Sequence, residues 1–377
     1  MAIESLRTAA FRNLADAETN TAARNVFLVG ENGQGKTNFL EAIYFCCYAS
    51  SFRGVKDAEL ARRGEKEFAA AASWGKAENQ NSPELFARFR VSVKWEKQRK
   101  SIELDGKKIE DRKELLEVLP CVVFCHEDMD FVSGSQERRR WFFDQTQSLY
   151  DPLYLDDLRR YRRVLKSRNM ILREAKFALR GYRESCSLLD VLDPQLAEYG
   201  SRLMEKRREA AERFSAVFGP LYEEVSDIAG IGVAYGSSWP AGSNRIDAAG
   251  CAQVVREKRE ADFTQGLTVS GPHRDRYHFM RAGSEFAASA STGQRRLLAL
   301  LLRTAQARCF SGVTGKTPVL LLDDVLLELD GEKRRRFLSV MPEYEQAFFT
   351  FLPEEPHQGY RKSDTLVYHV AGGVITA

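Results

Sequence analysis

A glycine-rich octapeptide near the N-terminus, Gly30 to Thr37, constrains this chain more than any other feature. It reads Gly-Glu-Asn-Gly-Gln-Gly-Lys-Thr and fits the pattern G-x-x-x-x-G-K-[ST]. An apolar run at 26–29 precedes it, and a segment typical of a helix at 38–45 follows it. Glycines let successive backbone N–H groups point at one phosphate, and the helix N-terminus adds the positive end of its dipole. The motif therefore predicts a nucleoside triphosphate site between a buried strand and a helix.

This P-loop predicts both a nucleotide and a metal ion. Lys36 should reach the β- and γ-phosphates, and the hydroxyl of Thr37 should hold Mg²⁺. The chain lacks the Asn-Lys-x-Asp pattern that reads guanine, so ATP is the expected nucleotide. The residues predicted to bind it here are Gly30, Glu31, Asn32, Gly33, Gln34, Gly35, Lys36, Thr37 and Asn38.

An apolar run at 318–322 ends in two carboxylates, Asp323 and Asp324. A P-loop needs an acid at the C-terminal end of a neighbouring strand to complete the Mg²⁺ shell, and Asp323 fits this role. Asp324 should orient or deprotonate an attacking water, so the catalytic residues predicted are Lys36, Asp323 and Asp324. Further buried strands are expected at 122–124 and 346–351. Because most of the chain separates Lys36 from Asp323, the intervening segment should interrupt an ATPase domain rather than follow it.

A Ser-Thr-Gly-Gln turn at 291–294 precedes a segment typical of a helix at 297–309. A hydroxyl, a flexible backbone and a helix dipole together make an anion site, although the same residues can simply cap a helix. Since this turn lies between the P-loop and the Asp-Asp strand in sequence, we interpret it as an ABC-type signature. Such a signature contacts ATP held by another subunit.

Composition limits the compartment and the partners. The formal net charge is only +3, so any nucleic-acid contact must come from local clusters of basic residues. No signal peptide is expected, and the aliphatic run 297–302 is too short to cross a bilayer, so no membrane partner is predicted. The seven cysteines have irregular spacing, which favours a reducing, cytoplasmic location. For Cys121 and Cys125, buried thiols are favoured over a metal site.

The middle of the chain changes from strand-like to helical periodicity. Alternating residues at 85–93 and the Asp105-Gly106 turn signal predict a small antiparallel sheet. From 150 to 230 the period is helical and predicts an antiparallel hairpin, with a second helix that starts at an Asp193 cap and Pro194. We therefore expect three segments: 1–149 as the N-terminal half of an ATPase head, 150–262 as a helical arm domain, and 263–377 as the C-terminal half of the head.

The first helix of the arm is strongly basic. Residues 158–183 include ten basic side chains and one acidic side chain. Cations spaced along a helix can neutralise a row of phosphates and release their counterions, although they can also form a solvated face without a partner. Aromatic residues are sparse here, which favours duplex backbone over stacked single strands. The predicted DNA-binding residues are Arg159, Arg160, Arg162, Arg163, Lys166 and Arg168.

Several strings in the chain resemble those of the RecF family of bacterial recombination and repair ATPases, which is related to SMC and ABC proteins. They are the P-loop with Asn38, 11–14, 127–128, 138–140, Ser270-Gly-Pro-His-Arg-Asp275, 291–295 and Leu322-Asp-Asp-Val-Leu-Leu-Glu-Leu-Asp330. The resemblance covers nearly the whole chain. It implies an α/β fold: an ABC/SMC-like P-loop ATPase head with a small antiparallel sheet and an inserted antiparallel helical arm.

The resemblance also implies an activity and partners. These are an ATP-dependent homodimer, slow ATP hydrolysis, binding to double-stranded DNA near single-strand gaps, and work with RecR and RecO in loading RecA. It implies that Ser291 and Gly293, with Gln294 in the same turn, contact the γ-phosphate across the dimer. Asp330 would line this interface, and Arg12 would approach the nucleotide. Two alternatives remain: the nucleotide-binding subunit of an ABC transporter, and a DNA-binding scaffold that uses ATP only structurally.

Overall fold

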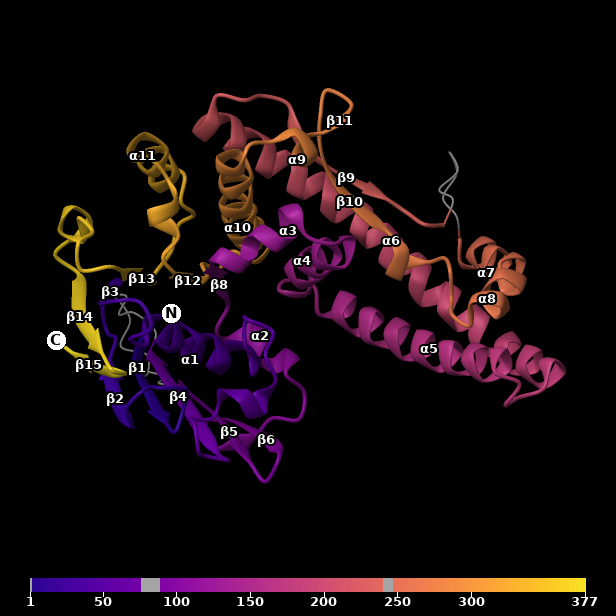
Figure 1. Cartoon of the computed structure of the whole chain (residues 1–377), viewed down its shortest axis with the longest axis horizontal. Helices are drawn as coiled ribbons and strands as arrows, with labels where there is room; N and C mark the ends of the chain where they lie inside the picture. Colours follow the sequence, from indigo (N-terminus) through magenta and orange to yellow (C-terminus); the bar gives the residue numbers. More distant parts are fainter. Residues whose placement is uncertain (1, 76–88, 240–246) are drawn as a thin grey trace. The chain divides into compact units, whose positions relative to one another are not determined.

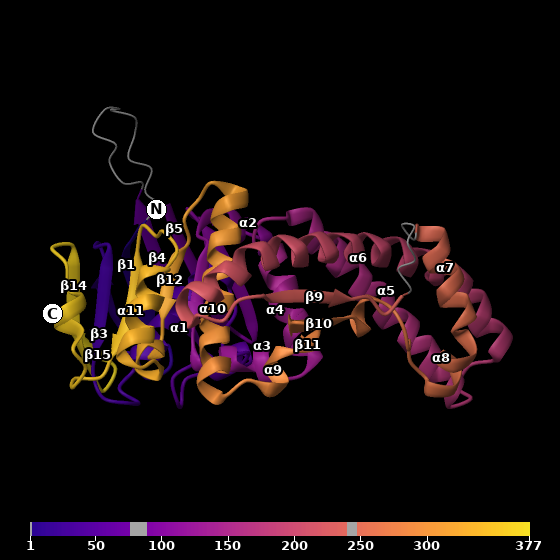
Figure 2. The same cartoon turned by 90° about the horizontal axis from the view of Figure 1, so that it is seen from above.

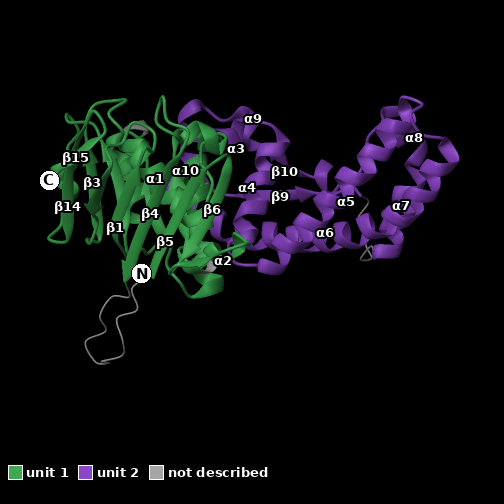
Figure 3. Cartoon of the chain, turned by 90° about the horizontal axis from the view of Figure 1, so that it is seen from below, with its two compact units in different colours: residues 1–128, 299–377 green, residues 129–298 purple. Residues whose placement is uncertain are grey.

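The computed structural model describes residues 2–75, 89–239 and 247–377. Two compact units are present: Met1–Asp128 with Ala299–Ala377, and Met129–Leu298 (Figure 3). The boundaries expected from the sequence, after 149 and after 262, differ from this division. Helix α4 (Gln136–Ser148) and strand β10 (Arg276–Arg281) pack with the helical segment and therefore belong to the second unit.

The first unit contains a mostly parallel sheet that carries both halves of the predicted nucleotide site. Its strand order is β15-β14-β3-β13-β12-β8, and its described pairs are parallel apart from the β14–β15 edge (Figure 1). The strands are β3 (Asn25–Val29), β8 (Cys121–Phe124), β12 (Val319–Leu322), β13 (Ala347–Phe351), β14 (Thr365–Ala371) and β15 (Val374–Thr376). The four strands expected from apolar runs are confirmed. β3, β8, β12 and β13 are buried at every position, as strands covered on both faces are.

An antiparallel sheet completes the first unit, in the order β2-β1-β4-β5-β6-β7. Its strands are β1 (Ala2–Ala9), β2 (Ala17–Asn20), β4 (Phe68–Gly75), β5 (Phe89–Glu96), β6 (Arg99–Leu104) and β7 (Lys107–Lys108). The predicted turn is confirmed, because Asp105 and Gly106 have φ of 50° and 77° between β6 and β7. Residues 85–88 of the predicted alternating run lie outside the described residues.

Helix α1 (Lys36–Tyr48) contacts strands of both sheets, and its residues from Phe39 onward are buried. The other helices of this unit are α2 (Lys113–Val118), α11 (Gly331–Ser339) and most of α10 (Thr292–Thr314), with short 3-10 turns η1 (Asp57–Leu60), η2 (His126–Asp128), η4 (Val325–Glu328) and η5 (His357–Tyr360). Cys121 and Cys125 are buried thiols, as expected. Among the described helices, none combines the length and the apolar content that a membrane span requires.

The second unit is built on two long helices, α5 (Pro152–Lys176) and α6 (Tyr182–Ser226) (Figure 2). They are antiparallel, because the cross-helix ion pairs Asp151–Lys206, Asp157–Arg202 and Arg168–Asp193 run in opposite chain directions. The remaining elements are α3 (Met129–Ser133), α4, β9 (Ile231–Gly236), α7 (Ala248–Glu257), α8 (Arg259–Gln265), η3 (Pro272–Arg274), β10, β11 (Ser284–Glu285) and α9 (Phe286–Ser289). The expected helical hairpin is therefore present.

The predicted start of the second arm helix is wrong. Helix α6 begins at Tyr182 and continues through Pro194, although proline removes one backbone hydrogen bond. Asp193 does not cap the helix, because its buried carboxylate accepts hydrogen bonds from Arg168 and Arg259 instead. The Asp-Pro start signal operates one helix earlier, where Asp151 caps α5.

Candidate nucleotide and DNA sites

The P-loop connects β3 to α1 with a backbone that requires glycine. Gly33 and Gly35 have φ of 78° and 119°, in the region that favours glycine. A Cβ atom on Gly30 would lie 2.3 Å from the carbonyl oxygen of Val370. A side chain at these positions would therefore strain the loop or collide with β14.

Lys36 and Thr37 are the first residues of α1 and follow this loop directly in the chain. The buried Lys36 ammonium donates to the carbonyl oxygens of Gly30 (2.7 Å) and Glu31 (3.2 Å), so it is held along the loop. The hydroxyl of Thr37 donates to Asp323 Oδ1 at 2.8 Å. The structure thus brings together the P-loop and the first of the two acids at the end of β12.

The paired acids share a polar network with Thr350 of β13. Burial raises the pKa of the Asp323 carboxyl to about 6, and the neighbouring charge of Asp324 acts in the same direction. The buried Thr350 hydroxyl accepts from the Asp324 backbone N–H and donates to its carboxylate, both at 2.7 Å. Asp324 itself has φ of 52°, so this contact holds a strained residue in place. The sequence gives no signal for Thr350, because it lies within an apolar strand.

A pocket of about 250 Å³ opens beside the loop. Its lining residues are Glu31, Asn32, Gly33, Gly35, Lys36, Thr37, Asn38, Arg53 and Asp324. Arg53 is not predicted by the sequence; it donates to Asn38 Oδ1 at 3.2 Å and follows α1 in an irregular segment without a motif.

Three predicted nucleotide contacts bond to other residues of the protein. Arg12 is not among the residues that line this pocket; its guanidinium pairs bidentately with the fully buried Glu41. The approach of Arg12 to the nucleotide stays a prediction. Gln34 accepts from the Gly372 backbone with its side chain, and Asn38 donates to Asn13, so both brace the loop from neighbouring segments.

The donor set fits a magnesium nucleotide. Mg²⁺ prefers oxygen ligands, and the Thr37 hydroxyl and Asp323 carboxylate supply two within hydrogen-bond distance of each other. The loop backbone and Lys36 supply N–H groups and a positive charge for phosphates. The residues that would hold the metal are Thr37 and Asp323.

The predicted signature turn belongs to the second unit and starts helix α10. Ser291 Oγ accepts from the Gln294 backbone N–H, and Gln294 Oε1 accepts from the Ser291 N–H at 2.8 Å, which is a capping box. Ser291 and Gly293 are exposed. Asp330 caps α11 by accepting from the Lys333 backbone N–H at 2.9 Å, and its carboxylate also pairs with the Lys333 ammonium. Both turns thus present exposed helix N-termini.

Four of the six predicted DNA-binding cations are exposed on α5: Arg160, Arg162, Arg163 and Lys166. Arg159 is partly exposed and lies 3.9 Å from Asp156. Arg168 is fully buried, where it pairs with Asp193 and Asp262, so its assignment as a DNA-binding residue is wrong. Sequence counts the cations on a helix but does not distinguish those that its neighbours enclose.

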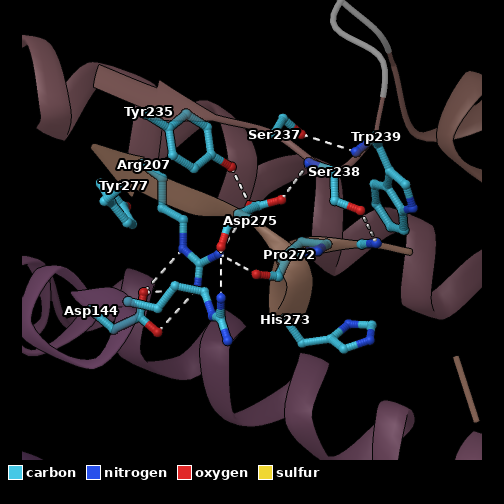
Figure 4. Close-up of polar contacts among 12 residues, drawn as sticks. Asp144, Arg207, Tyr235, Ser237, Ser238, Trp239, Pro272, His273, Asp275 and Tyr277 are labelled. Carbon is cyan, nitrogen blue, oxygen red and sulfur yellow. Dashed lines mark hydrogen bonds and ion pairs between the residues drawn. The ribbon is translucent and has the colours of Figure 1, made fainter. Parts of the chain in front are cut away.

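Two residues of the Gly-Pro-His-Arg-Asp string, Pro272 and Asp275, belong to a buried polar network around Arg207 of α6 (Figure 4). Arg207 donates to Asp144 through Nε and to Asp275 through Nη1, both at 3.0 Å. Asp275 also accepts from Tyr235 and from the Ser238 backbone. This motif therefore has a structural role that fixes the turn between β10 and the helices.

The fold and site together define the class of protein. A P-loop and a strand ending in paired acids share one parallel sheet, and a long helical hairpin is inserted between them in the chain. This is an ABC/SMC-type ATPase head with an inserted helical arm.

Comparison with known proteins specifies the family. The RecF/RecN/SMC N-terminal domain model matches residues 2–371. The DNA replication and repair protein RecF of Treponema pallidum is 40% identical over 365 residues, which are 96% of this chain and 97% of the relative. The chain belongs to the RecF family.

Solved structures agree with this assignment. The structure of the recombination mediator protein RecF with ATP has a TM-score of 0.86 at 26% identity and covers 100% of this chain and 97% of its own. An Smc head domain from Pyrococcus furiosus, with a TM-score of 0.54 at 18% identity, covers 100% of this chain and 96% of its own. At that identity the Smc likeness concerns the fold alone.

Proposed function

We propose that this protein binds ATP with Mg²⁺, hydrolyses it slowly, and binds double-stranded DNA near single-strand gaps in replication and recombinational repair. The observation that carries the proposal is the hydrogen bond between Thr37 and Asp323 beside the buried Lys36. The likeness to the Treponema pallidum DNA replication and repair protein and to the solved RecF structure with ATP supports it.

The roles follow from the site. The loop amides and Lys36 bind the phosphates, and Thr37 with Asp323 holds the metal. The metal, when bound, neutralises charge on the phosphates. The Thr350 hydroxyl holds the Asp324 carboxylate through Oδ1, so that Asp324 can orient the attacking water.

ATP would bridge two copies of the chain. Ser291, Gly293 and Gln294 of one copy would contact nucleotide held by the P-loop of the other, and Asp330 would line the interface. The exposed capping turn of Ser291 supports this, because the positive end of a helix dipole attracts phosphate. Dimer formation would then depend on ATP, and hydrolysis would open the dimer.

DNA would bind along the exposed face of α5 through Arg159, Arg160, Arg162, Arg163 and Lys166. RecR and RecO are the proposed protein partners, in keeping with the RecFOR pathway to which the solved RecF relative belongs. A cytoplasmic location accords with cysteines that form no disulfide.

Turnover measurements test the enzymatic part. ATP hydrolysis with and without duplex DNA should be slow but measurable in the wild type and near the background in Lys36→Met and Asp324→Asn. A scaffold that uses ATP only structurally is the second candidate, because Asp324 is engaged by Thr350. Equal, background rates in the wild type and Asp324→Asn, with ATP-dependent dimers intact, would favour the scaffold.

A further inference from the structure

A second polar pocket, of about 410 Å³, opens in the second unit among α4, α5 and the turn at 271–275. Four arginines line it: Arg140, Arg162, Arg207 and Arg274. The carboxylates on its lining are Glu137 and Asp144. Arginines contributed by four different elements therefore outnumber the acids at one place.

Of the two carboxylates, Glu137 is exposed and Asp144 is already engaged. Asp144 accepts from Arg207 Nε and Nη2, each at 3.0 Å, and also from the Tyr154 hydroxyl. Arg162 reaches Asp144 only at 3.5 Å, and its side chain remains 59% exposed. Arg274 is exposed, and its side chain forms no hydrogen bond or ion pair with the described residues. Arg162 and Arg274 thus retain donors for an external anion.

The interior of the pocket has an excess of positive charge. Arg140 donates from Nη1 to the Asp275 carbonyl oxygen at 2.7 Å, and burial and then the Arg207 charge lower the pKa of its guanidinium. Burial also lowers the pKa of His273 to about 4, with Arg274 and Arg140 acting in the same direction. His273 is therefore neutral at pH 7, with its ring nitrogens bonded to Tyr161 and the Thr268 carbonyl. An anion in the pocket would relieve this repulsion.

We propose that this pocket binds a phosphate group of a DNA strand, held by Arg162 and Arg274 at its mouth and Arg140 at its floor. Arginine suits phosphate because its planar fork donates two parallel hydrogen bonds. Lys166 is exposed one turn beyond Arg162 on the same face of α5 and would receive a neighbouring phosphate. The inference that the bound phosphate belongs to DNA rests on the proposed function, whereas the inference that the pocket binds phosphate does not.

Arg274→Gln is the decisive variant. The Arg274 side chain bonds to no other described residue, so its replacement should not disturb the fold. Arg276→Gln is the matched control, since Arg276 is also exposed, two positions along the chain, but does not line this pocket. Duplex affinity would be measured over a salt series with an oligonucleotide that lacks terminal phosphates. Trp141 lines the pocket and is 36% exposed, so its fluorescence reports occupancy during titration with the duplex or with inorganic phosphate. Trp141→Phe identifies the part of the signal that comes from this site.

Arg274→Gln should weaken duplex binding roughly tenfold, and Arg162→Gln/Arg274→Gln should reduce the salt slope by about one. Arg276→Gln should match the wild type. The proposal is overturned if Arg274→Gln and the double variant match Arg276→Gln in both affinity and Trp141 response. If the double variant Arg163→Gln/Lys166→Gln weakens duplex binding but the pocket variants do not, the exposed surface of α5 binds DNA and the pocket proposal is wrong. If the duplex does not bind but inorganic phosphate changes Trp141 fluorescence in an Arg274-dependent manner, the pocket binds phosphate and the proposed DNA binding is wrong.

Discussion

The Thr37 hydroxyl lies 2.8 Å from the Asp323 carboxylate, although 286 positions separate the two residues in the chain. The contact exists because β3 and β12 both pair with β13 in one parallel sheet, so their C-terminal ends meet at the same edge. The second unit, 129–298, lies between these two strands in the chain. The nucleotide site therefore depends on long-range strand pairing rather than on a local sequence unit.

Thr350→Val should lower the rate of ATP hydrolysis while leaving ATP affinity largely unchanged. The substitution keeps the shape of the buried side chain but leaves the Asp324 N–H without its acceptor and the Asp324 carboxylate without its donor. ATP affinity should be unchanged because Thr350 does not line the nucleotide pocket. The kcat should fall roughly tenfold, in line with the loss of about 1–3 kcal/mol from an unsatisfied buried group. Single-turnover hydrolysis and nucleotide titration measure the two quantities separately.

Thr350→Ser is the control for this position, because it retains the hydroxyl and should restore most of the rate. A Val variant with wild-type kcat, or a Ser variant as slow as Val, would show that the hydroxyl does not position Asp324.

Ser291→Asp should abolish ATP-dependent dimerisation without unfolding the protein. Aspartate caps a helix as well as serine does and suits the helix dipole, so α10 keeps its start. Its charge would repel a triphosphate presented by a second copy. Sedimentation should give monomers without ATP for every variant, dimers with ATP for the wild type and Ser291→Thr, and monomers with ATP for Ser291→Asp. An ATP-dependent Ser291→Asp dimer of normal affinity would exclude contact between this turn and the nucleotide.

Much of the head could be predicted from local patterns. The P-loop, the apolar strands and the Asp105-Gly106 turn are specified by residues close together in the chain, and each lies at the predicted place. The contact of Thr37 with Asp323 is as predicted, but the expectation that their strands are neighbours is wrong, because β13 lies between β3 and β12. Thr350 could not be found in this way, because its role depends on which strand lies beside β12.

The arm shows where local patterns fail. Asp193-Pro194 carries the same start signal as Asp151-Pro152, yet only the second begins a helix. The difference is tertiary: Asp193 is buried against Arg168 and Arg259, which lie on other helices. The same burial removes Arg168 from the basic surface to which its sequence neighbours belong.

Arg168→Met should destabilise the protein by about 3–5 kcal/mol, because it leaves the buried carboxylate of Asp262 without its cation. The matched change on the exposed surface, Arg163→Met, should alter stability by less than about 0.5 kcal/mol but reduce the salt slope of duplex binding by about one. Chemical denaturation and DNA titration of both variants measure the contrast. Equal stability of the two variants would show that the buried cluster contributes little to folding.

Stability should fall as the pH is lowered from about 6.5 to about 4, in part because of His273. Burial lowers the pKa of His273 from 6.5 to about 4 in the folded protein, so only the unfolded chain binds this proton within that window. The folded state loses up to about 3 kcal/mol relative to the unfolded state across this pH window.

His273→Gln, which cannot titrate, should flatten this part of the profile of thermal unfolding against pH, whereas His369→Gln at an exposed position should leave it unchanged. Arg274→Gln should shift the His273 pKa upward in an NMR titration, because it removes a cation that opposes protonation. A His273→Gln profile as steep as that of the wild type would mean that other groups cause the acid sensitivity.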